Sequence, residues 1–146
     1  MGITVEQLVK QFHMEHFTHS DKDSIKQIHE PDVNRPALQL TGYFEHFEES
    51  RVQIIGTVEY TYLQHLSHEQ RVIIYEGLLS HKIPCIIFCR GFQPDEEFLK
   101  IADEYGVPIY GTKQPTSNFM AEIIYFLNTK LAPCISIHGV LVDVYG

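Results

Sequence analysis

Histidine is the residue type in this sequence best suited to metal binding, and three histidines near the start are evenly spaced. His13, His16 and His19 recur at every third position, and imidazole nitrogens bind zinc and nickel readily. Steps of three drift around a helix of about 3.6 residues per turn, so the rings do not stay on one face. We predict an exposed histidine cluster here and no metal site, and the same for His65 and His68, which flank a predicted helix boundary.

Two of the three cysteines are close in sequence. Cys85 and Cys89 are four residues apart, which differs from the C-x-x-C spacing of redox and zinc sites. Residues i and i+4 of a strand share a face, so both thiols are predicted to lie in the core. With Cys134 the count is odd, and all three lie in apolar segments. This usage is typical of a reducing compartment, and we expect the cytoplasm.

Four polar residues lie at the ends of predicted elements. They are Asn34, Arg35, Glu59 and Arg90, and three of them are expected beside the carboxyl edge of a sheet. Open α/β sheets bind ligands at that edge, so these side chains are candidates to line a pocket for a small regulatory metabolite. The alternative is a capping or ion-pairing role, which is the more frequent use of such residues.

The first third of the chain has two predicted helices. Thr4 to Gln7 has the pattern of a capping box, and apolar residues at helical spacing predict a helix over 4–12. Residues 13–35 are polar and turn-rich, which favours short strands or loops. Pro36 is suited to the first position of a second helix, which we expect to end at Gly42.

From Val52 onward, apolar strands alternate with amphipathic helices. The predicted strands cover residues 52–55, 84–88 and 107–110. The predicted helices follow Gly56 through residue 66, begin after a capping box at Ser67, run from Pro94 to Gly106, and span 115–131. This order predicts a mostly parallel sheet covered on both faces, an α/β three-layer sandwich.

Composition excludes several classes of protein. The 146 residues fit one domain, with 44% apolar and 21% charged residues, as in folded globular proteins. The net charge of −8 without a basic stripe argues against nucleic acid as a partner. No apolar run approaches the roughly 20 residues of a membrane span, and no signal peptide is apparent, so we expect no membrane partner.

Two long strings resemble HPr kinase/phosphorylase, the bacterial enzyme that phosphorylates and dephosphorylates a serine of the phosphocarrier HPr. The first string is NRPALQLTGYF at residues 34–44, followed by RVQIIG at 51–56 and then by Glu59. The second is LAP at 131–133, followed by IHGVLVDVYG at 137–146. Ala37 departs from the family pattern, in which many members have Gly after the proline.

In that family the second string leads directly into a G-x-x-x-x-G-K-[ST] phosphate-binding loop. No glycine of this sequence is followed by Lys. The resemblance therefore predicts that residues 1–132 form the N-terminal α/β domain and that 133–146 are the first strand of the missing kinase domain. The parent enzyme would use ATP or pyrophosphate with Mg²⁺, whereas this fragment would hold no cofactor and be inactive alone.

The resemblance has further implications. It assigns a catalytic role to His138, and it implies a hexameric homo-oligomer that contacts HPr through the kinase domain. It places the enzyme in the phosphotransferase system and carbon catabolite repression, with a regulatory or assembly role for this domain. The fold would be similar to the substrate-binding domains of Mur ligases. The alternative is a freestanding sensor or adaptor that binds a small ligand without catalysis.

Overall fold

The protein is built around a five-stranded, mostly parallel sheet. A computed structural model describes residues 2–19 and 26–132. The strand order is β2-β7-β6-β5-β4, and the four strands from β4 to β7 are parallel. These are β4 (Val33–Asn34), β5 (Val52–Ile55), β6 (Ile86–Phe88) and β7 (Ile109–Gly111). Every residue of β5, β6 and β7 is buried, as the continuous apolar runs predict for strands covered on both faces.

One edge of the sheet is closed by a short strand within residues 13–35, where the sequence predicted short strands or loops. β2 (Glu15–His16) is exposed and pairs antiparallel with β7. The segment after it is held by backbone hydrogen bonds from Phe17 and Thr18 to the carbonyl of Ile109. A second, separate pair joins β1 (Ile3–Thr4) to β3 (Gln27–Ile28).

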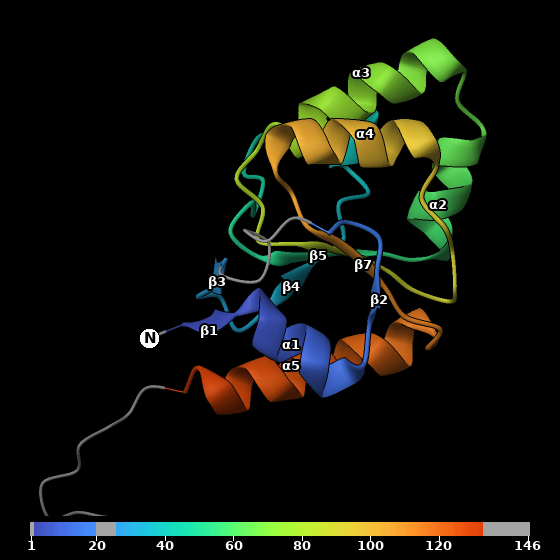
Figure 1. Cartoon of the computed structure of the whole chain (residues 1–146). Coiled ribbons are helices and arrows are strands. Elements are labelled where there is room, and N and C mark those ends of the chain that lie inside the picture. The colour runs from blue at the N-terminus through green and yellow to red at the C-terminus, as the bar shows by residue number, and fades with distance from the viewer. Residues whose placement is uncertain (1, 20–25, 133–146) are drawn as a thin grey trace, which may run out of the picture.

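Helices cover both faces of the sheet, so the predicted three-layer α/β architecture is confirmed (Figure 1). One face carries α2 (Thr57–Gln64), α3 (His68–Leu79) and α4 (Glu96–Tyr105). The other face carries α1 (Val5–Phe12) and α5 (Thr116–Lys130). None of the helices in the described ranges is long and apolar enough to cross a membrane.

Local signals in the sequence set most helix ends. Both predicted capping boxes are present, with Thr4 at the start of α1 and Ser67 at the start of α3. Asp95 caps α4, which ends at Gly106 in the left-handed conformation (φ 71°). A glycine takes this conformation without the steric cost that a Cβ would bring.

The helix predicted over residues 36–42 is wrong in type and length. The segment forms only a short 3-10 helix, η2 (Gln39–Thr41), although it does end at Gly42 as expected. Leu40 is fully buried while Leu38 is 61% exposed, so the segment inserts one apolar side chain into the core. The connection between β4 and β5 is held by the burial of Leu40, and one short turn is enough to place that side chain.

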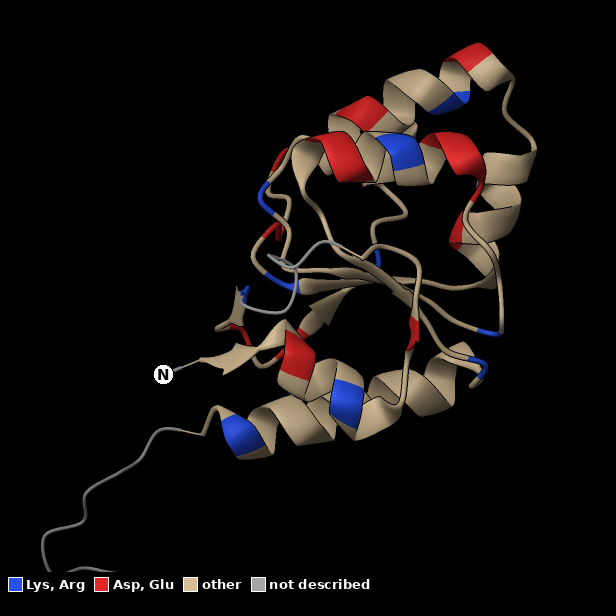
Figure 2. Ribbon diagram, in the orientation of Figure 1, with Lys and Arg blue, Asp and Glu red and all other residues tan. Residues whose placement is uncertain are grey.

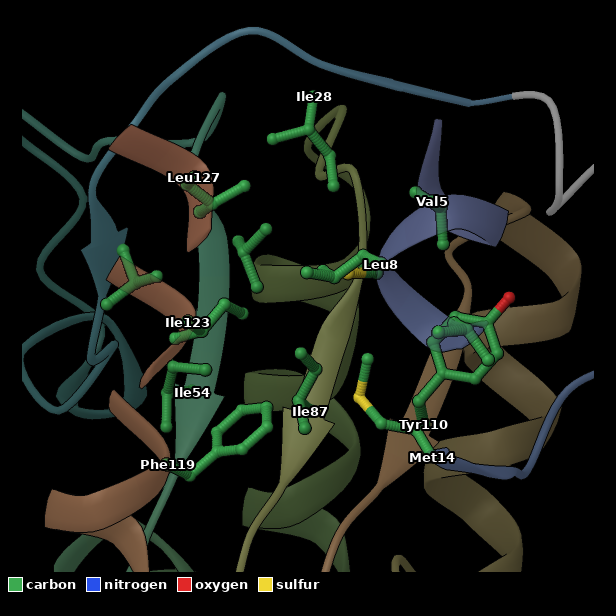
Figure 3. Packing of buried hydrophobic residues seen from close by; sticks show 14 of the residues in the cluster. Val5, Leu8, Met14, Ile28, Ile54, Ile87, Tyr110, Phe119, Ile123 and Leu127 are labelled. Carbon is green, nitrogen blue, oxygen red and sulfur yellow. The ribbon is translucent and has the colours of Figure 1, made fainter. Parts of the chain in front are cut away.

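Each face of the sheet has its own hydrophobic core. Figure 3 shows the core under α1 and α5, where Leu8, Ile123 and Phe119 pack against Ile54 and Ile87 of the sheet. The opposite core lies under the other three helices, where Tyr75, Leu79 and Phe98 of the helices pack with Phe88 of β6 and Ile109 of β7. The two cores share only the sheet between them.

Candidate ligand site at the carboxyl edge of the sheet

An ion pair joins two of the predicted site residues at the carboxyl edge. Arg35, directly after β4, donates from Nε and Nη2 to the two carboxylate oxygens of Glu59, at 3.0 and 2.8 Å. Glu59 is 2% exposed, whereas the Arg35 side chain is 36% exposed. Two parallel hydrogen bonds of this kind hold both groups in a fixed geometry.

Glu59 also fixes the start of α2. Its Oε1 accepts a hydrogen bond of 2.8 Å from the amide of Gly56, the residue that links β5 to the helix. A Cβ at Gly56 would lie 2.6 Å from Nη2 of Arg35 and 2.8 Å from Oγ1 of Thr116. Glycine is required here because an arginine and the start of α5 both approach the backbone closely.

Thr116 and Cys89 form the buried floor of this edge. The hydroxyl of Thr116 is buried and has no hydrogen-bond partner within the described residues. It lies close enough to the Cys89 thiol to affect its ionisation. Burial raises the pKa of Cys89 to about 11, and Thr116 and the Arg35 charge oppose that rise only in part. At neutral pH the thiol is therefore protonated and a poor nucleophile.

Arg90 lies at the same edge, after β6, in a conformation unusual for a non-glycine residue. Its φ is 59°, and its amide donates to the carbonyl of Gln114 at 2.9 Å. The next amide, of Gly91, donates to Thr112, also at 2.9 Å. These bonds between neighbouring connections hold Arg90 in the left-handed region with its side chain exposed.

Asn34 has no hydrogen bond to Arg35 or Glu59 among those found in the described residues. Its side-chain amide donates at 2.7 Å to the carbonyl oxygen of Gln53, on the adjacent strand. Gln53 is fully buried and donates in turn to the carbonyls of Glu48 and Arg51. Asn34 thus completes the hydrogen bonds of a buried polar side chain, which is a structural role.

The other candidates also have defined positions. His13 ends α1 with φ 51°, and the rings of His16 and His19 stack at 6.3 Å. Within residues 2–19 and 26–132, no three His, Cys, Asp or Glu side chains are arranged to hold a metal ion. Cys85 and Cys89 are buried in the same core, as predicted for i and i+4 on a strand. His138 lies outside the described residues, so its catalytic role stays a prediction.

Gly56 and Thr116 are part of this edge but were not predicted from the sequence. A glycine between a strand and a helix is a common pattern, and a threonine after a proline is equally ordinary. Their role depends on close packing between the connection after β5 and the start of α5, because Gly56 and Thr116 are 60 residues apart in sequence but lie side by side in the fold. The edge offers two arginines, two helix starts and a buried hydroxyl, which suits binding of a polar ligand better than covalent chemistry.

Comparisons with known proteins connect the sequence to one family. The family model described as HPr Serine kinase N terminus matches residues 3–127. The HPr kinase/phosphorylase of Lachnoclostridium phytofermentans is 53% identical over 145 residues, which cover 98% of this chain and 47% of that protein. The HPr kinase/phosphorylase of Caldicellulosiruptor bescii is 43% identical, with 98% and 46% covered. The chain thus spans about half the length of these curated relatives.

A solved structure supports the fold. The CBS and DRTGG domains from the regulatory region of a Clostridium perfringens pyrophosphatase, crystallised with the activator diadenosine tetraphosphate, align with a TM-score of 0.56. The alignment covers 83% of this chain and 45% of that one, at 16% sequence identity. At this identity the likeness concerns the chain fold alone.

Proposed function

Because the chain belongs to the family of the HPr serine kinase N terminus, we propose that it serves an HPr kinase/phosphorylase as its regulatory and assembly domain. In this proposal the complete enzyme phosphorylates and dephosphorylates a serine of HPr in carbon catabolite regulation, in the cytoplasm and as a homo-hexamer. The observation that carries it is the match of nearly the whole chain to the first half of such enzymes.

The phosphoryl-transfer step is assigned to residues outside this domain. ATP or pyrophosphate with Mg²⁺ requires a glycine-rich loop, a lysine on the phosphates and a hydroxyl on the metal. None of the nine glycines in the sequence is followed by lysine. The carboxyl edge does not replace these groups, because the carboxylate of Glu59 is bound to Arg35 and to the Gly56 amide.

Phosphorylation assays on two proteins test this proposal. The full-length product of the gene, incubated with HPr and ATP–Mg²⁺, is expected to phosphorylate HPr on serine. The 146-residue chain is expected to show no transfer, and millimolar ATP should leave its melting temperature unchanged because a protein is stabilised only by what its folded state binds. A thermal melt of each preparation is the control for folding.

Three results would contradict the proposal. Transfer to HPr by the 146-residue chain would place catalysis in this domain, and clear stabilisation of the chain by ATP would place a nucleotide site there. A gene that stops soon after Gly146 would instead favour the alternative, a freestanding sensor or adaptor. In that case Arg35, Glu59 and Arg90 would be the proposed ligand-binding residues.

A further inference from the structure

We draw no further inference here: the strongest candidate, the groove between α1 and α5 that Phe12, Tyr125 and Phe126 line on the face of the sheet away from the acidic residues of α3 and α4 (Figure 2), carries none because nothing in the part of the chain that the structure describes shows what covers it.

Discussion

At the scale of single residues, Glu59 is the charged side chain that is buried in the described structure. Its carboxylate is buried, accepts two hydrogen bonds from Arg35 and one from Gly56, and so connects the end of β4 to the start of α2. A buried charge is tolerated only when its hydrogen bonds are satisfied. The ion-pairing and capping interpretation of these residues therefore has direct geometric support, whereas their role in ligand binding stays a prediction.

Replacement of this carboxylate should destabilise the protein. Glu59→Ala leaves the Arg35 guanidinium and the buried Gly56 amide without their acceptor. We expect a loss of about 2–3 kcal/mol in the free energy of unfolding, below the value for a fully buried pair because Arg35 is partly exposed. Urea unfolding measures it. Glu69→Ala is the matched control, since Glu69 is an exposed glutamate in the first turn of α3, and a similar loss in both would contradict this assignment.

At the scale of elements, α3 and α4 are joined by one shared side chain. Asp95 caps α4 through a 2.8 Å bond from the Phe98 amide, and its other oxygen accepts a 2.7 Å bond from the Tyr75 hydroxyl. Arg71 approaches the same carboxylate at 3.5 Å. One residue thus fixes both where α4 begins and how it packs on α3.

This double role predicts an unusually large capping effect. Asp95→Ala removes the cap and leaves the buried Tyr75 hydroxyl without its acceptor, so we expect a loss of about 2–3 kcal/mol. Ser67→Ala removes the exposed cap of α3 alone and should cost about 1 kcal/mol. Thermal or urea unfolding compares the two variants. Equal losses would mean that the Tyr75 contact contributes nothing.

At the scale of the whole molecule, the sheet separates two cores that each bury an ionisable group. Cys89 lies in the core under α1 and α5, and Tyr75 lies in the core under α3 and α4. Burial raises the pKa of both groups, for Cys89 from 9.0 to about 11. In the folded protein each group therefore loses its proton only at a higher pH than it would in the unfolded chain.

Stability should therefore fall in alkaline solution. A thiol whose pKa is higher in the folded state stabilises that state fully below its unfolded pKa, and this contribution is lost as the pH rises through the folded value. Between pH 9 and 11 we expect Cys89 to contribute up to about 1.4 kcal/mol of lost stability per pH unit. Urea unfolding of the unmodified chain and of Cys89→Ala measures the difference. Parallel pH profiles for the two proteins would contradict the assignment.

The sequence alone was sufficient for the central α/β repeat. Continuous apolar runs identified β5, β6 and β7, and capping residues located the starts of α1 and α3, because these signals depend on neighbours within about four residues. The buried pair Cys85 and Cys89 followed from strand alternation in the same way. The family resemblance rested on long contiguous strings, and the match over residues 3–127 confirms it.

Only the tertiary structure decided the features that join distant segments. β2 is two exposed residues whose strand character comes from pairing with β7, and the helix expected from Pro36 is limited to η2 by the burial of Leu40. The choice of Arg35 as the partner of Glu59 depends on the order of β4 and β5 in the sheet. Such contacts have no periodicity in the sequence, because chain topology, and not local propensity, brings their members together.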